Sequence, residues 1–188
     1  IQYINDLSFE FAPLNPIQSA AIGGSPGWKG AQTPSSAVRL FQVDDENYRI
    51  EGAPGTGSKA PGWLEVNDGK GTLALTLRDF WQQWPKSLEV DSKTVRLGLF
   101  PRFEAGAFAH MQPWYKHDYL FEGISYRLRQ GQSRRWQVWA DLSGNGEALT
   151  KSINAHLVPA ADPTQAIATG AWGFVAAAGS KGMAEYDS

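Results

Sequence analysis

GWLEVNDGKGTLALTL, residues 62–77, is the stretch that decides the fold. Two alternating runs, 62–66 and 72–77, flank the turn-forming segment 67–71, which contains Asp68-Gly69. An Asp-Gly pair between two alternating runs is a strong local signal for a β-hairpin, because both residues tolerate the positive φ angles of tight turns. This stretch therefore predicts two antiparallel strands in the middle of the chain.

Further strand-like runs lie on both sides of this hairpin. They are residues 4–14, 37–43, 48–51, 94–100, 119–129, 134–142 and 155–158. We expect one hairpin across the acidic turn 44–47, and another between 119–129 and 134–142 across 130–133. About ten short strands and almost no amphipathic helix predict an all-β fold, an antiparallel β-sandwich with long loops.

The domain organisation follows from where this pattern stops. Residues 1–158 are expected to form the β-sandwich domain, with long loops at 23–36, 54–61 and 102–118. Residues 159–188 are rich in small residues and have little periodicity, and we expect an irregular linker or packed tail there.

Composition excludes several classes of function. A net charge of −2 argues against nucleic-acid binding, and no apolar run is long enough to span a bilayer. The absence of cysteine excludes a disulfide framework and a thiolate metal site. The chain begins at Ile1 rather than Met, so we expect a processed or excised piece of a larger protein. The expected location is extracellular or periplasmic.

RDFWQQWPK, residues 78–86, follows the hairpin and is the densest cluster of aromatic and polar side chains. Pro85 limits any helix here to a single turn that ends at about Gln83. One hypothesis makes this corner a platform on which a sugar ring stacks, with Gln83 or Lys86 bonding its hydroxyls or carboxylates. The alternative is a core plug. We expect Phe80 and Trp81 to be largely buried, and Gln83, Trp84 and Lys86 to meet a ligand or a partner domain.

Four cations could form a rim around that corner, namely Arg78, Lys86, Arg102 and Lys116. Such a rim would suit an acidic polysaccharide, because arginine binds carboxylates in a bidentate geometry. Scattered solvated charge is the alternative interpretation for each cation alone.

The segment 114–119, WYKHDY, offers the groups that β-elimination of a uronate requires. His117 or Tyr115 could be the base or acid, and Lys116 or Arg102 the cation that stabilises the enolate. Any loop with these residue types would offer the same chemistry. Trp114 is a candidate for ligand binding beside them.

The strand 134–142 carries Arg135, Trp136 and Trp139. Side chains alternate along a strand, so we expect one tryptophan to face inward and the other outward. An outward tryptophan would be a sugar platform or half of a cross-strand aromatic–cation pair. The candidate ligand-binding residues are Trp84, Lys86, Gln83, Arg78, Trp114, Trp136 and Arg135.

No cofactor is predicted. The three histidines, at 110, 117 and 156, do not have metal-ligand spacing. Calcium could sit on the acidic turn 44–47, but this turn lacks the glycine and spacing of a helix-loop-helix site, and a solvated turn is preferred.

Several phrases resemble the bacterial and fungal exo-rhamnogalacturonan lyase-like family. They are residues 62–66 (GWLEV), 77–90 (LRDFWQQWPKSLEV), 95–101 (VRLGLFP) and, more loosely, 126–142 and 169–173. The resemblance implies a large multidomain enzyme that cleaves pectic rhamnogalacturonan by β-elimination, with a β-sandwich beside a helical toroid. This chain would correspond to the β-sandwich portion only.

The leading hypothesis is a carbohydrate-binding β-sandwich domain of a polysaccharide-degrading, lyase-like protein. Its partners would be an acidic pectic or algal polysaccharide and an adjoining catalytic domain. One alternative is a polysaccharide lyase in its own right. The other is a structural domain that packs on a missing catalytic domain.

Overall fold

The computed structural model describes residues 1–24, 28–30, 37–111, 120–155, 162–171, 173, 176 and 180. Contacts divide the chain into two compact units, Ile1–Ala155 and His156–Ser188. The second unit contains the short helix α3 (Pro163–Ala168), which begins after Asp162, whose carboxylate accepts a hydrogen bond from the Thr164 backbone N–H. The sheets described below belong to the first unit.

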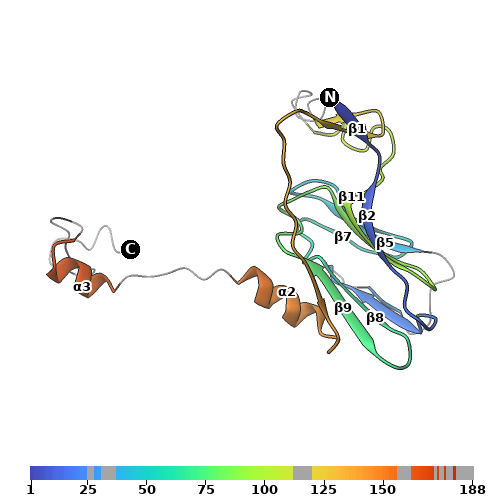
Figure 1. Cartoon of the computed structure of the whole chain (residues 1–188), viewed down its shortest axis with the longest axis horizontal. Coiled ribbons are helices and arrows are strands. Elements are labelled where there is room, and N and C mark those ends of the chain that lie inside the picture. Colours follow the sequence, from blue (N-terminus) through green and yellow to red (C-terminus); the bar gives the residue numbers. More distant parts are fainter. Residues whose placement is uncertain are drawn as a thin grey trace. The chain divides into compact units, whose positions relative to one another are not determined.

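Two antiparallel sheets form the body of the first unit (Figure 1). The six-stranded sheet has the order β2 (Leu7–Phe11), β11 (Val95–Phe100), β10 (Lys86–Val90), β5 (Val38–Gln42), β6 (Tyr48–Glu51) and β7 (Thr56–Gly57). The five-stranded sheet has the order β14 (Val138–Asp141), β9 (Thr72–Leu77), β8 (Trp63–Asn67), β3 (Ser19–Ile22) and β4 (Trp28–Gly30).

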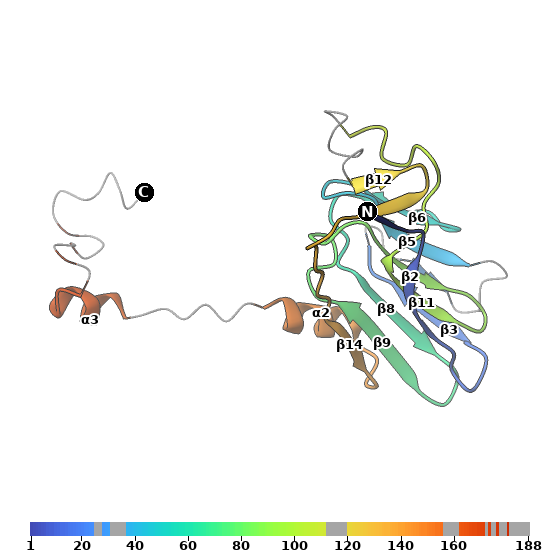
Figure 2. The same cartoon turned by 45° about the horizontal axis from the view of Figure 1, so that its top comes forward.

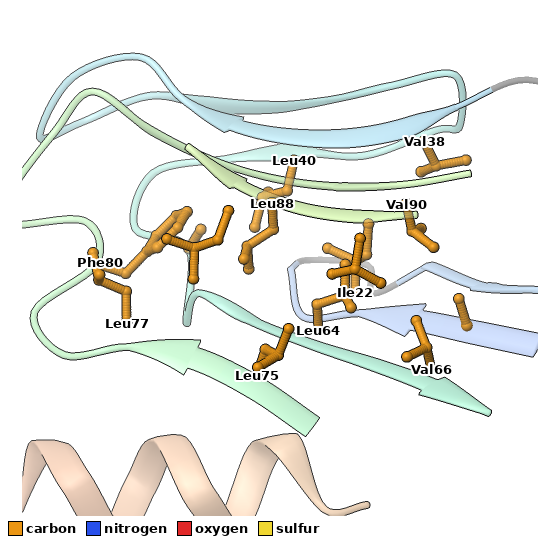
Figure 3. Close-up of a cluster of buried hydrophobic side chains, with 14 of the residues drawn as sticks. Ile22, Val38, Leu40, Leu64, Val66, Leu75, Leu77, Phe80, Leu88 and Val90 are labelled. Carbon is orange, nitrogen blue, oxygen red and sulfur yellow. The ribbon is translucent and has the colours of Figure 1, made fainter. Parts of the chain in front are cut away.

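The main hydrophobic core fills the space between these two sheets, as Figure 3 shows. Alternate residues of each strand point into it, because successive side chains on a strand face opposite sides. The core side chains include Val38, Leu40, Leu88 and Val90 from one sheet and Ile22, Leu64, Val66, Leu75 and Leu77 from the other. Full burial of each such side chain contributes about 1.5–3 kcal/mol.

One end of this core carries a buried polar residue, Gln42, on the core-facing side of β5. Its amide nitrogen donates to the carbonyls of Asp44 (2.7 Å) and Ser58 (2.8 Å). Its amide oxygen accepts from the Ala60 backbone N–H at 2.9 Å. Gln42 thus ties the segment after β7 to β5, and its register partner across the sheet is Lys86.

A third, three-stranded sheet lies beyond one end of the sandwich (Figures 1 and 2). Its order is β1 (Gln2–Ile4), β13 (Ser125–Leu128) and β12 (Phe121–Glu122). A second apolar cluster packs this sheet against the outward-facing side chains of β5, and consists of Phe41, Val43, Phe103, Phe108, Phe121 and Tyr126. Phe108 and Phe121 stack in parallel with their ring centroids 3.9 Å apart.

Helix α2 (Gly146–Asn154) packs on the outer face of the five-stranded sheet (Figure 3). The Asn145 side chain caps it by accepting from the Ala148 N–H at 2.9 Å. Thr150 donates to the Thr76 hydroxyl on β9 at 2.8 Å. Among the described residues, no helix has the length and apolar character needed to cross a bilayer.

The antiparallel β-sandwich fold is confirmed, as are the hairpins β5–β6 and β8–β9. The strand at 94–100 is confirmed as β11. The run 4–14 contains β2 and the last residue of β1, Ile4, with the break at Asn5-Asp6.

The predicted hairpin across 130–133 is wrong. β13 pairs with β1 and β12, whereas β14 pairs with β9, so the segment between them connects two different sheets. β13 pairs with its neighbour β12 and with the distant β1, and β14 pairs with the distant β9. A local pattern does not reveal the distant partners.

The end of the first unit also differs from the expectation. Helix α2 precedes the strand predicted at 155–158, Ala155 is not in a strand, and residues 156–158 lie outside the described residues. Strand β4 lies within the predicted loop 23–36, and strands β3 and β10 were not predicted.

Candidate functional site

The corner 78–86 connects β9 to β10, and its first half closes the core. Phe80 is 1% exposed and packs against Gly62, where an added Cβ would collide with the ring. Gly62 also has a φ of +75°, which favours glycine. Trp81 is half-buried, and the Lys59 ammonium lies 4.4 Å from the centroid of its ring. Phe80 is therefore the plug, and Lys59 occupies one approach to Trp81.

The second half of the corner is a single turn of backbone. The Gln83 N–H donates to the Asp79 carbonyl at 3.0 Å, and the Trp84 N–H donates to the Trp81 carbonyl at 3.4 Å. The turn ends at Gln83, as expected from the presence of Pro85, and β10 begins at Lys86. This path leaves Gln83 and Trp84 half-buried at the surface of the corner.

Lys86 is 2% exposed and lies at the end of the core beside Gln42. Its ammonium donates to three backbone carbonyls, those of Gln83 (2.5 Å), Pro85 (2.9 Å) and Leu99 (2.9 Å). Burial, followed by the positive charge of Arg134, lowers the pKa of Lys86 from 10.5 to about 7. Lys86 is thus a buried cation and not part of an exposed rim.

A cavity of about 270 Å³ opens beside Lys86, between the corner and the three-stranded sheet. Apolar and aromatic side chains form most of its wall, including Ile4, Leu7, Trp84, Phe100, Phe121, Tyr126 and Trp136. Its charged lining residues are Lys86, Arg127 and Arg134, and Gln83 and Gln132 add amides. No carboxylate belongs to the described lining. The cavity wall is therefore mostly apolar, and its charged groups are all cations.

Trp136 and Trp139 face different environments, as expected from strand alternation. Trp136 is half-buried, lines the cavity, and packs edge-on against Phe100 with the ring centroids 5.3 Å apart. Trp139, on β14, is 45% exposed and lies outside the cavity. The tryptophan available to a ligand in the cavity is therefore the inward one.

The predicted cationic rim does not form as one feature. Arg78 donates to the Gln137 side chain at 3.2 Å and lies outside the cavity lining. Arg102 is exposed on the outer face of the six-stranded sheet, where it pairs with Asp6 at 2.9 Å. Lys116 lies outside the described residues, and of the other three predicted cations only Lys86 lines the cavity.

The predicted catalytic cluster cannot be placed in this geometry. Trp114, Tyr115, Lys116 and His117 all lie outside the described residues. Arg102, the remaining member, is the residue paired with Asp6.

The acidic turn considered for calcium is held together by Asp44. The Asp44 carboxylate accepts from the Glu46 N–H (2.8 Å) and the Asn47 side chain (3.0 Å), and it shares a hydrogen bond with His110. Burial alone raises the pKa of Asp44, but these hydrogen bonds outweigh it and lower the pKa. Within the described ranges, no three His, Asp or Glu side chains gather closely enough to hold a metal ion.

The sequence reasoning missed Arg134 as a lining residue, and it chose Arg135 in its place. Arg135 does not line the cavity. In an extended segment, residues two apart face the same side. Arg134 therefore lines the cavity together with Trp136, and Arg135 does not. That spacing was available in the sequence once the inward tryptophan was known.

The fold and this site define an antiparallel β-sandwich domain with a cationic, aromatic-lined cavity at one end. Residues 50–98 match the family model described as the PcRGLX-like protein central beta sandwich domain. The matched segment runs from β6 to β11 and includes the hairpin 62–77 and the corner 78–86. It is consistent with the resemblance to the exo-rhamnogalacturonan lyase-like family in this part of the chain. No curated protein matches the sequence.

Proposed function

We propose that this chain is the carbohydrate-binding β-sandwich domain of a polysaccharide-degrading, lyase-like protein, and that it binds an acidic pectic or algal polysaccharide. The observation that carries the proposal is the cavity beside Lys86, which combines tryptophan rings with three cations. The proposal includes an adjoining catalytic domain as a partner and a location outside the cell or in the periplasm.

The size and lining of the cavity support a sugar ring as the ligand. At about 270 Å³ the cavity lies near the lower end of ligand pockets, which suits one ring better than an extended chain. Trp136 and Trp84 offer apolar surfaces against which a ring can pack, while Gln83 and Gln132 offer amides for hydroxyl groups.

The charge of the lining supports an acidic sugar over a neutral one. Arg127 and Arg134 contribute guanidinium groups, which bind carboxylates with two parallel hydrogen bonds. The Arg127 guanidinium lies 3.5 Å from the Glu122 carboxylate on β12 and is half-buried, whereas Arg134 is exposed. For both reasons Arg134 is our choice for the principal carboxylate contact.

Affinity electrophoresis against acidic pectic and neutral glycans tests the proposal. We expect polygalacturonate or rhamnogalacturonan to retard the wild-type chain, and galactan to leave it unretarded. Trp136→Ala should weaken the affinity at least about fivefold, since an aromatic anchor at a binding site is typically worth more than about 1 kcal/mol.

Trp139→Ala is the matched control, because it removes a tryptophan three residues away that does not line the cavity. It should bind as the wild type does. Equal losses in Trp136→Ala and Trp139→Ala, or no retardation of the wild type by any acidic glycan, would reject the proposal.

A further inference from the structure

The feature that the proposed function does not account for is the burial of Lys86. Its side chain is 2% exposed, and no carboxylate in the described part of the chain pairs with its ammonium. Its Nζ lies 5.7 Å from the Trp136 ring centroid and 5.9 Å from that of Phe100, and both rings line the cavity. A cation thus lies in an apolar wall with only dipoles as partners.

A buried charge without an ionic partner is unfavourable, and the usual response is loss of the charge. The three carbonyls oppose this response, because together they accept all three N–H donors of an ammonium group. A neutral amine would keep only two donors and leave one carbonyl without its bond. Lys86 is therefore balanced between its two protonation states, and a negative charge nearby would favour the ammonium.

We infer that a carboxylate entering the cavity is bound together with a proton that Lys86 takes up, so that Lys86 makes binding at this site depend on pH. The inference rests on the proposed function, because it assigns a regulatory residue to the same site. It also revises the role predicted for Lys86 from the sequence. Lys86 would act through its charge from within the cavity wall, and not by direct hydrogen bonds to sugar hydroxyls.

The other charged groups around Lys86 favour this coupling. From the segment after β13, Arg134 faces it and disfavours its charge, and Arg127 on β13 also lines the cavity. Tyr126 on β13 has its pKa raised by burial, and so it stays neutral. On β5 the register partner is the uncharged Gln42, and β11 contributes the Leu99 carbonyl and the Phe100 ring. On β12, Glu122 lies 3.5 Å from Arg127 but does not line the cavity. A bound carboxylate would therefore be the first negative charge within the described lining.

The direction of the pH dependence follows from the lowered pKa of Lys86, which is about 7 in the ligand-free protein. Below pH 7 the ammonium is already present, so affinity should be full and independent of pH. Above pH 7 the free protein must gain a proton on binding, and affinity should fall by up to about tenfold per pH unit. At pH 8, uptake should approach one proton per ligand bound.

Isothermal titration calorimetry with galacturonic acid tests the coupling in two buffers of different ionisation enthalpy. At pH 8 we expect the observed binding enthalpies in the two buffers to differ by nearly the full difference between the buffers' ionisation enthalpies. At pH 6 we expect the two binding enthalpies to be the same. Lys86→Arg, which carries a permanent charge, should bind without proton uptake. Lys151→Arg is the matched control on an exposed lysine of α2, and it should behave as the wild type does.

Binding that shows no proton uptake at pH 8, or uptake that persists in Lys86→Arg, would overturn the inference and leave the proposed function standing. A second measurement does not need a glycan. NMR titration of the lysine side chains should show Lys86 titrating well below the exposed lysines, and added acetate, the minimal carboxylate, should raise its pKa. A Lys86 signal that titrates with the exposed lysines, or that does not respond to acetate, would overturn the inference independently of sugar binding.

Discussion

Single residues decide whether the corner 78–86 closes the core or opens to a ligand. Phe80 points into the core, whereas Trp84 and Lys86 contribute to the cavity wall. The close approach of Phe80 to the backbone requires a glycine at position 62, because an added Cβ there would lie 2.2 Å from the Phe80 side chain. The core plug and the ligand wall are therefore built from neighbouring residues of one turn.

Replacement of Gly62 tests this arrangement at the residue scale. Gly62→Ala should destabilise the domain by about 1–3 kcal/mol, because the alanine would be strained at a φ of +75° and would displace Phe80. Gly71→Ala is the control, since a Cβ at Gly71 meets no atom within 4 Å. Urea unfolding gives the free energies. Equal stability of Gly62→Ala and Gly71→Ala would contradict the packing described here.

The sequence predicted part of the site at this scale. Strand alternation distinguished the environments of Trp136 and Trp139, and the corner was recognised as the place where aromatic and polar groups gather. The burial of Lys86 could not be predicted, because it depends on β10 beginning at that residue and on carbonyls from Leu99 and Gln83 converging there.

At the scale of elements, local pattern predicted the strands of two hairpins but missed β3, β4, β7 and β10 and the pairing of strands distant in the chain. The hairpins across 44–47 and 67–71 were confirmed because each turn fixes the pairing of its two strands. β13 and β14 pair with strands about 125 and 65 residues earlier in the chain, and no local signal specifies such partners. Helix α2 was missed because the residues at its start, Gly144 and Asn145 before the helix and Gly146 as its first residue, have the composition of a turn.

Helix α2 offers an element-scale prediction through its cap. Asn145→Ala removes the side chain that accepts from the Ala148 N–H, and it should lower the free energy of unfolding by about 1 kcal/mol. Ser152→Ala, at an exposed position within the same helix, should change it by less than about 0.5 kcal/mol. Chemical denaturation followed by circular dichroism measures both. A stability of Asn145→Ala equal to that of Ser152→Ala would show that the cap does not support the helix.

At the scale of the first unit, the cavity exists because the three-stranded sheet packs against one end of the sandwich. The segment that matches the family model supplies Gln83, Trp84, Pro85 and Lys86 to the wall. The remaining wall comes from β1, β2, β12, β13, the end of β11 and the segment 132–136, all outside the matched residues. Because the chain must bring these distant segments together, the cavity could not be predicted from any one of them.

The central claim is that this cavity is the place where an acidic sugar binds. The most direct test is to titrate the isotopically labelled chain with oligogalacturonate and to follow the amide and indole N–H signals by NMR. We predict that the largest shifts fall on the indoles of Trp84 and Trp136 and on the backbone of 132–136, with Trp63 and Trp139 nearly unchanged. Shifts centred on the separate charged hollow that Arg39 of β5 and Arg96 of β11 line together with Arg102 would contradict the account, as would the absence of shifts at high ligand concentration.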